Sequence, residues 1–260
     1  MYYISTYPLG GKKLIEFADE LRHNGLDDVG FELFYDNIPF YGAKYYRHFL
    51  NGIKLGMHCP MEGCCLLAPK GSLDFEYTLD KHRACFELAQ NLDAKYVVIH
   101  TNSLAARTKD RIAAQKELLP ERMAMTADIA KQFGLRIAVE NVGFGYNNSL
   151  VAELSDFIGL DQNRELDFLI DTGHAHANGW DLPMLISTLS SRIRGFHFHD
   201  NDGSEDSHMP IGSGNSEWKN IFEAIKRSAY SADRTIEYAA PYANEIISGI
   251  KLLKSRLENK

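Results

Sequence analysis

The sequence contains few cysteines and no long run of apolar residues, and both shortages narrow the class of protein. Its four cysteines are Cys59, Cys64, Cys65 and Cys85, and their spacing matches neither a disulfide framework nor a zinc site built from paired CxxC motifs. The N-terminal stretch lacks the basic and apolar segments of a secretory signal, and no stretch approaches the roughly 18 apolar residues that span a bilayer. We therefore expect a cytoplasmic protein with reduced thiols and no membrane partner.

Linkers, low-complexity segments and an excess of basic residues are also missing. Of the 260 residues, 28 are basic and 35 are acidic, which gives a net charge of −7. This balance weakly disfavours binding to nucleic acid through a broad basic surface. About 250 residues are typical of one (β/α)8 barrel. We expect residues 1–260 to form a single domain, and we do not expect nucleic acid as a partner.

Short apolar segments alternate with longer helical patterns along the whole chain. In the first helical pattern Leu14, Phe17, Ala18 and Leu21 have the spacing of one buried helix face. Eight strand-and-helix units in succession predict a parallel sheet, and eight such units can close into a barrel. The expected fold class is therefore α/β, a (β/α)8 TIM barrel. The expected strands are Tyr2–Ser5, Asp28–Phe34, Lys54–Pro60, Lys95–His100, Leu135–Asn141, Leu166–Asp171, Ile193–His199 and Arg234–Tyr238.

Seven of the eight expected strands carry an apolar residue followed directly by an ionisable one. Side chains alternate between the two faces of a strand, so an apolar residue that packs against the helices places the next residue inside the barrel. Most of these ionisable residues stand near the carboxyl ends of their strands, where active sites of this fold are built. Several charges converging there would be costly to bury without a cation or a polar substrate. The pairs are Phe31-Glu32, Met57-His58, Ile99-His100, Val139-Glu140, Ile170-Asp171, Phe196-His197 and Ile236-Glu237.

Histidine and carboxylate side chains together form the expected site. Neutral imidazole combined with carboxylate suits Zn²⁺, Mn²⁺ or Fe²⁺ better than an ion that prefers oxygen alone, and we expect zinc or manganese, one to three ions per chain. Asp171 and His174 stand three residues apart where a strand turns into a loop, and Asp206 and His208 stand two apart, so each pair can face one centre. The expected ligands are His58, His100, Glu140, Asp171, His174, His197, Asp206, His208 and Glu237.

The motifs around these residues follow one another in a recognisable order. They are HCP (58–60), VVIHTNS (97–103), AVENVG (138–143), IDTGHAHANGWDL (170–182), FHFHDN (196–201), DSHMPIGSGN (206–215) and TIEY (235–238). Taken together, and over nearly the whole chain, they resemble the motifs of the xylose isomerase-like barrels. That family includes sugar and sugar-phosphate isomerases and epimerases and the endonuclease IV group.

The resemblance implies a role for each motif residue. Glu140, Asp171, His197 and Glu237 would hold a core metal ion, and the other five expected ligands would complete a two- or three-metal site or contact substrate. Glu140 and Glu237 are also the expected catalytic residues: beside a metal-polarised carbonyl, one would remove a proton from the adjacent carbon and the other would return it. The further residues expected to bind substrate are Glu32, Asn141 and His199, with a salt bridge in the barrel as the alternative for Glu32 and a metal ligand as the alternative for His199.

Three functions remain open at this stage, and we favour the first. It is metal-dependent isomerisation or epimerisation of a small sugar, sugar phosphate or related polyol, and the sequence is compatible with a homo-oligomer. The second is incision of abasic DNA as in endonuclease IV, but CPMEGCCLL after His58 offers no aromatic wedge for duplex DNA and adds an acidic residue. The third is a barrel that keeps the metal site and only binds a ligand, which a test for turnover would distinguish.

Overall fold

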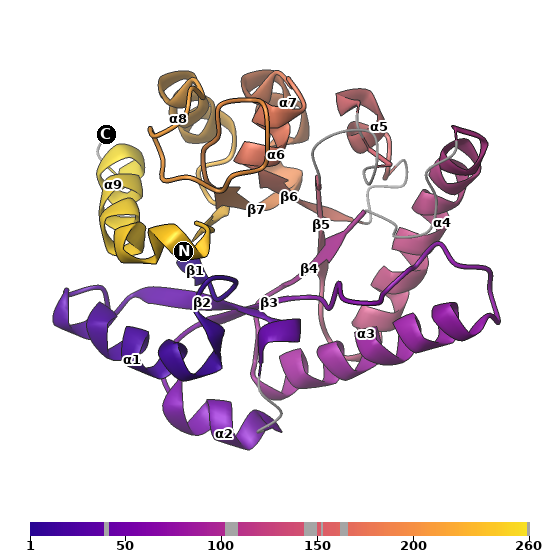
Figure 1. Cartoon of the computed structure of the whole chain (residues 1–260), viewed down its shortest axis with the longest axis horizontal. Helices are drawn as coiled ribbons and strands as arrows, with labels where there is room; N and C mark the ends of the chain where they lie inside the picture. Colours follow the sequence, from indigo (N-terminus) through magenta and orange to yellow (C-terminus); the bar gives the residue numbers. More distant parts are fainter. Residues whose placement is uncertain (39–41, 102–108, 143–149, 152, 162–165, 259–260) are drawn as a thin grey trace.

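Apolar, β-branched and aromatic residues dominate eight short segments, and each of them is a strand in the computed structural model of the chain. The strands pair in parallel with their neighbours in sequence, and β8 pairs with β1 to close the barrel (Figure 1). The predicted α/β fold class and (β/α)8 architecture are confirmed. The structure describes residues 1–38, 42–101, 109–142, 150–151, 153–161 and 166–258.

The elements follow the predicted order. The strands are β1 Tyr2–Ser5, β2 Val29–Phe34, β3 Leu55–His58, β4 Val97–His100, β5 Ile137–Glu140, β6 Asp167–Asp171, β7 Ile193–Phe198 and β8 Asp233–Ile236. The α-helices are α1 Gly10–His23, α2 Gly42–Phe49, α3 Leu73–Asn91, α4 Lys109–Gln132, α5 Leu154–Ile158, α6 Thr172–Ala177, α7 Leu182–Leu189, α8 Trp218–Ser228 and α9 Ile246–Glu258. Three 3-10 helices, η1 Tyr35–Asn37, η2 Ser190–Arg192 and η3 Ala240–Glu245, complete the described elements.

Two strands end two residues earlier than predicted, although their backbone pairing continues past the assigned ends. The backbone N–H of Cys59, beyond β3, donates to the carbonyl of Val98 at 2.9 Å, and that of Glu237, beyond β8, donates to Phe198 at 3.2 Å. Glu237 therefore stands in the sheet at the carboxyl end of the barrel, as the sequence pattern requires.

The two faces of the sheet have separate apolar cores. All seven apolar members of the predicted pairs lie in the large core between sheet and helices, and each is at most 1% exposed, so their predicted outward orientation is confirmed. Inside the barrel a second cluster fills the floor; its buried members are Tyr3, Tyr96, Val98, Ala138 and Leu169. The floor is thus packed with side chains, and the ionisable residues of the same strands stand above it.

Two glycines create the space that the floor aromatics occupy. A Cβ on Gly30 of β2 would lie 2.7 Å from the ring of Tyr3, and a Cβ on Gly56 of β3 would lie 2.7 Å from the ring of Tyr96. Both distances are far below a normal carbon–carbon contact of about 3.5–4.0 Å. The two tyrosine rings themselves meet edge to face, with centroids 5.5 Å apart.

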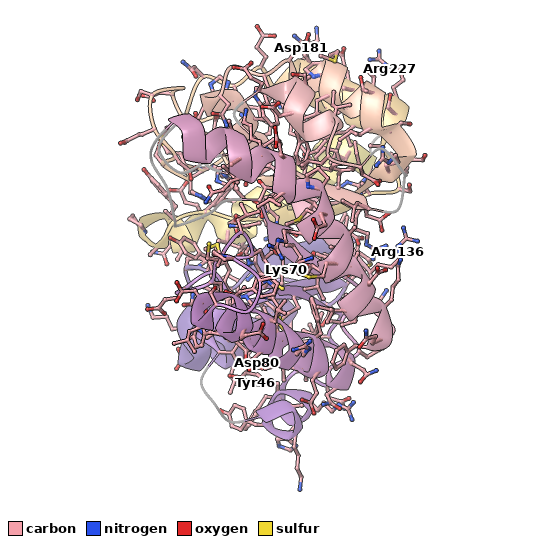
Figure 2. All side chains as sticks on the ribbon, turned by 90° about the vertical axis from the view of Figure 1, so that its right-hand side faces the viewer. Tyr46, Lys70, Asp80, Arg136, Asp181 and Arg227 are labelled. Atoms are coloured by element: carbon pink, nitrogen blue, oxygen red, sulfur yellow. The ribbon has the colours of Figure 1, made fainter. Side chains whose placement is uncertain are left out.

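The helices surround the barrel. In Figure 1 the last helix, α9, lies near the marked N-terminus, and it contacts β8, which pairs with β1. Charged side chains such as Arg136 and Arg227 stand at the edge of the molecule in Figure 2. Within the described residues, no helix combines the length and the apolar character needed to cross a membrane.

Candidate metal centre

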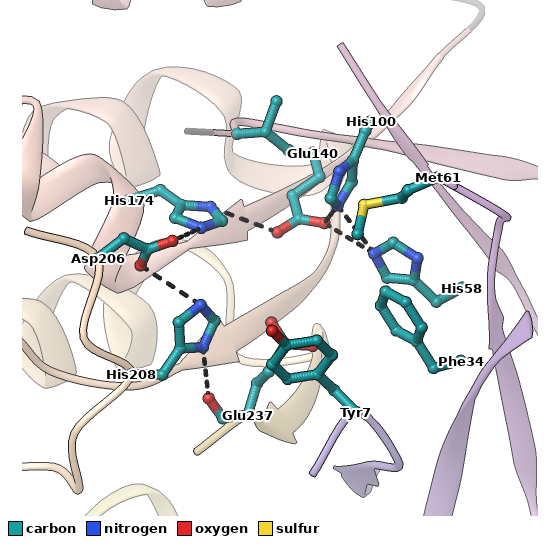
Figure 3. A pocket seen from close by; sticks show the side chains of 11 residues that line it. Tyr7, Phe34, His58, Met61, His100, Glu140, His174, Asp206, His208 and Glu237 are labelled. Atoms are coloured by element: carbon teal, nitrogen blue, oxygen red, sulfur yellow. Dashed lines mark hydrogen bonds and ion pairs between the residues drawn. The ribbon is translucent and has the colours of Figure 1, made fainter. Parts of the chain in front are cut away.

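The nine predicted ligands meet at the carboxyl end of the barrel. Most of them border a cavity of about 210 Å³, whose described lining also includes Tyr7, Phe34, Met61 and Val142. Figure 3 shows Glu140 between a pair of histidines on one side and a group of His174, Asp206 and His208 on the other. The ligands come from β3 (His58), β4 (His100), β5 (Glu140), β6 (Asp171), α6 (His174), β7 (His197), the loop after β7 (Asp206, His208) and the end of β8 (Glu237).

A central group of four side chains lies deepest. It consists of Glu140, Asp171, His197 and Glu237, each at most 5% exposed. Nδ1 of His197 lies 3.1 Å from Oε2 of Glu237, 3.3 Å from Oε1 of Glu140 and 3.8 Å from Oδ2 of Asp171. Three carboxylates and one neutral imidazole carry a formal charge of −3, so a divalent cation bound among them would offset most of the charge of this group.

A second group shares Glu140 with the first. His58 and His100 approach each other with their Nε2 atoms 2.9 Å apart. Nε2 of His100 lies 3.0 Å from Oε2 of Glu140, and Nε2 of His58 lies 3.5 Å from the same oxygen. Because the two oxygens of Glu140 face different groups, this residue can bridge two bound ions.

A third group forms the rim of the site. Nε2 of His174 lies 3.0 Å from Oδ2 of Asp206, and Nε2 of His208 lies 3.3 Å from Oδ1 of the same carboxylate. The ring of His199 stacks on that of His208, with centroids 3.7 Å apart, and supplies a fourth donor side chain. His208 has a backbone φ of 44°, a left-handed conformation that is uncommon for a residue other than glycine.

Backbone carbonyls orient three of the imidazoles. Nδ1 of His58 lies 3.0 Å from the carbonyl of Cys59, that of His174 lies 2.9 Å from Asn141, and that of His208 lies 2.8 Å from Glu237. A carbonyl can only accept, so each Nδ1 carries the proton and each Nε2 presents a lone pair to the site when the ring is neutral. Histidines that bind a metal through one ring nitrogen usually donate the N–H of the other nitrogen to such an acceptor.

Charge attraction among these groups outweighs their burial. Burial raises the pKa of the Glu140 carboxyl, but attraction to His197 and His100 holds this pKa well below its usual range. Burial lowers the pKa of His208, but its bond and attraction to Asp206 raise this pKa to about 9. In the metal-free protein, protons on histidine therefore balance part of the carboxylate charge, and a metal ion would have to displace them.

The residues of the site fit a divalent metal ion of the zinc type. Within the described chain, both oxygens of Glu140 and Nδ1 of His197 are buried without a hydrogen-bond partner. Buried polar atoms of this kind are normally satisfied, and a cation among them would satisfy all three. Mixed imidazole and carboxylate donors suit zinc and other transition metals rather than calcium or magnesium.

The three predicted substrate-binding residues do not line the cavity. Glu32 is fully buried, and its Oε1 lies 2.8 Å from Nε2 of His197, a contact of the kind named as the alternative role for Glu32. Asn141 bonds the backbone of Asp171 through both side-chain atoms and ties β5 to β6. His199 contacts the Asp171 carboxylate at 2.9–3.0 Å beneath His208. None of the three is among the described residues that line the cavity, and their contact with substrate stays a prediction.

Two further residues support the site, and of these the sequence interpretation missed Ser5. Ser5, at the end of β1, donates its hydroxyl to Oε1 of Glu237 at 2.8 Å; its position at the end of the one strand without an ionisable pair was the available signal. Asp200 accepts hydrogen bonds from the backbone of Gly212 and Gly214 and from the indole of Trp218, at 2.7–3.0 Å. This carboxylate holds the glycine-rich end of the loop that carries Asp206 and His208.

Comparisons with known proteins place the chain among barrels of one type. A 185-residue region is 24% identical to the uncharacterised protein MJ1311 of Methanocaldococcus jannaschii, over 70% of this chain and 62% of that protein. Another of 171 residues is 20% identical to fructoselysine 3-epimerase of Shigella flexneri, over 65% of this chain and 61% of that enzyme. The chain thus spans only about three fifths of the length of these relatives.

Solved structures share the architecture over the whole chain. The structure of a D-tagatose 3-epimerase-like protein superposes with a TM-score of 0.84 at 19% identity, over 99% of this chain and 97% of that one. The TTHB071 protein from Thermus thermophilus, soaked with ZnCl2, superposes with a TM-score of 0.76 at 19% identity, over 100% and 99%. At these identities the likeness shows the fold. A family model described as xylose isomerase-like TIM barrel matches residues 8–256, and the chain belongs to that family.

Proposed function

We propose that the protein is a divalent-metal-dependent epimerase or isomerase of a small carbohydrate. The observation that carries this proposal is the placement of Glu140 and Glu237, which come from the fifth and eighth strands. Both line the cavity, and each has an oxygen within 3.3 Å of Nδ1 of His197. Two carboxylates that border the same small space can take a proton from a bound substrate and return it.

The chemistry follows from the groups around the cavity. A divalent ion bound by Glu140, Asp171, His197 and Glu237 would polarise a substrate carbonyl as a Lewis acid, which makes the adjacent carbon–hydrogen bond more acidic. One carboxylate then removes that proton and the other protonates the carbon. Ser5 holds Oε1 of Glu237 in place, and Oε2 of the same carboxylate lies 3.1 Å from Nδ1 of His197.

The described wall of the cavity favours a neutral substrate. A volume of about 210 Å³ suits a single sugar. Among the described residues that line it there is no lysine or arginine, the side chains that usually bind a phosphate group in proteins. The epimerases among its relatives and structural neighbours support a carbohydrate, and the zinc-soaked neighbour supports zinc as the ion.

Exchange of a substrate proton with solvent tests the proposal directly. A panel of ketoses incubated with the zinc- or manganese-loaded protein in heavy water should acquire deuterium at the carbon next to the carbonyl, because a protonated carboxylate exchanges with solvent before returning its proton. Glu237→Gln should reduce this exchange by about 10²–10⁴-fold. Mass spectrometry of the sugar measures the label, and elemental analysis of each variant separates loss of the carboxylate base from loss of metal.

Glu217→Gln serves as the matched control, because Glu217 is a glutamate outside the cavity. It should exchange at the wild-type rate. The wild-type protein could also bind sugars without exchanging their protons or converting them. The better assignment would then be a protein that only binds its ligand. Conversion of a sugar without uptake of deuterium would still show an enzyme. Its mechanism would then be a hydride shift between neighbouring carbons rather than proton transfer.

Hydrolysis of a phosphodiester is the second candidate, and one observation favours it. Three adjacent ligand groups offer room for more than one ion, and sites with several metal ions are common among phosphatases and nucleases. The net charge of −7 and the absence of basic side chains from the described cavity wall weigh against a DNA substrate. Incision of an abasic duplex at rates typical of enzymes, abolished by Glu140→Gln, would reverse the ranking.

A further inference from the structure

A buried carboxylate stands directly beneath the deepest histidine of the site. Glu32 of β2 is fully buried, and its Oε1 lies 2.8 Å from Nε2 of His197, which is also fully buried. Within the described chain, neither atom has a hydrogen-bond partner of good geometry, so the contact is an ion pair. The Nδ1 atom of the same ring faces the central ligand group. The imidazole thus lies between Glu32 on one side and the ligands on the other.

The barrel floor holds Glu32 in place. The hydroxyl of Tyr96 donates to Oε2 of Glu32 at 2.7 Å, and that of Thr235 donates to the same oxygen at 3.3 Å. Tyr96 stands just before β4 and reaches Glu32 on β2 across β3, because Gly56 has no Cβ to block its ring. Residues from four strands or strand ends therefore hold the Glu32 carboxylate so that its Oε1 points at His197.

We propose that Glu32 is a positioning residue that orients the imidazole of His197 and keeps its proton on Nε2, so that Nδ1 is free to bind the metal. Outer carboxylates of this kind raise the basicity of a ligating histidine and fix its ring, and their loss typically weakens metal binding by about 10–100-fold. The inference rests on the proposed binding of a divalent metal. A positioning role explains why the carboxylate of Glu32 is buried in the barrel although it does not reach the cavity.

The affinity of the metal-free protein for Zn²⁺ tests this role. Competition with a chromogenic chelator should show binding to Glu32→Gln that is about 10–100-fold weaker than to the wild type. Tyr96→Phe keeps the carboxylate and removes one of its anchors, so a smaller loss of affinity is expected. Asp161→Asn is the control: Asp161 is also a buried carboxylate, bonded to Leu166 and Arg192, but it does not line the cavity. It should bind Zn²⁺ as the wild type does.

A spectroscopic measurement separates positioning from a general loss of stability. In the zinc-loaded wild type, ¹⁵N NMR of labelled histidine should show one ring with the proton on Nε2 and the metal on Nδ1, assigned to His197 by its loss in His197→Ala. In Glu32→Gln the Nε2 proton should exchange faster with water. The inference would be overturned if Glu32→Gln bound Zn²⁺ with wild-type affinity and gave an unchanged spectrum. Loss of affinity in His197→Ala would show, in the same experiment, that the protein still binds the metal through His197. If the wild-type protein binds no Zn²⁺, the proposed metal dependence fails first.

Discussion

Two layers of inward-facing residues in the same barrel have opposite characters. The lower layer is apolar and packed, whereas the layer two residues further along the same strands is ionisable and borders the cavity. The clearest examples are Val98 and His100 on β4, Ala138 and Glu140 on β5, and Leu169 and Asp171 on β6.

The difference between the layers lies in what their atoms contact. Floor residues such as Val98 and Leu169 are fully buried against one another and need no further partner. Within the described chain, both oxygens of Glu140 in the upper layer lack a hydrogen-bond partner. We infer that the floor stabilises the fold and that the upper layer is arranged for a bound group. Mutations in the two layers should therefore separate stability from function.

The largest effect is expected from Glu140→Gln in the upper layer. Glu140 belongs to two ligand groups, so the variant should lose metal from both and lose about 10²–10⁴-fold or more in turnover. The metal-free variant should still fold, because neither oxygen of Glu140 makes a well-formed hydrogen bond among the described residues. Elemental analysis, circular dichroism and the exchange assay measure the three outcomes.

Glu237→Gln provides the comparison for this prediction, since Glu237 belongs to the central group but not to the group of His58 and His100. It should lose fewer equivalents of metal than Glu140→Gln. Equal metal loss in the two variants would show that Glu140 does not bridge two ions.

A floor substitution should have the opposite consequence. Leu169→Ala removes a fully buried side chain from the floor cluster, and such a change typically costs about 2–5 kcal/mol of unfolding free energy. The folded fraction should keep its metal content. Urea denaturation measures the first quantity and elemental analysis the second. Loss of metal without loss of stability would show that the two layers do not divide the roles in this way.

The smallest effect is expected from a rise in pH. It should lower the stability of the metal-free protein and raise its affinity for zinc. The pKa of His208 is raised to about 9 from 6.5 in the metal-free protein. Its contribution to stability is therefore complete below pH 6.5 and lost as pH rises through 9, with a slope of at most about 1.4 kcal/mol per pH unit for each proton. Zinc must displace that proton, so zinc affinity should rise over the same interval.

Thermal unfolding of the metal-free protein and zinc titrations between pH 6.5 and 9 check both signs. His208→Gln cannot be protonated in this range and should reduce the pH dependence of both curves. If the metal-free protein instead became more stable toward pH 9, the protonated state assigned to His208 would be wrong.

Much of the site was predictable because strand periodicity is a local property. Alternation along a strand places every second side chain inside the barrel, and that rule brought His100, Glu140 and Asp171 to one end of it. The outward orientation of their neighbours Ile99 and Val139 follows from the same alternation.

The depth of each residue could not be predicted in this way. Glu32 and His58 have the same pattern in the sequence, but in the sheet Glu32 is paired with Gly56, and His58 is paired with Phe34. Glu32 therefore stands lower in the barrel than His58, between the apolar floor and the ligands, and contacts His197 rather than the cavity. The stagger between neighbouring strands sets this height, and it depends on closure of the whole barrel.

The sequence by itself determined the barrel, its eight strands and the set of candidate donors, because hydrophobic periodicity and residue chemistry are carried by short segments. Only the tertiary structure decided how the donors divide into three groups, with Glu140 shared by two of them. It also decided that carbonyls such as those of Cys59 and Asn141 turn imidazole nitrogens toward the site. Those contacts join residues from different strands and loops, and their geometry exists only once the sheet has closed.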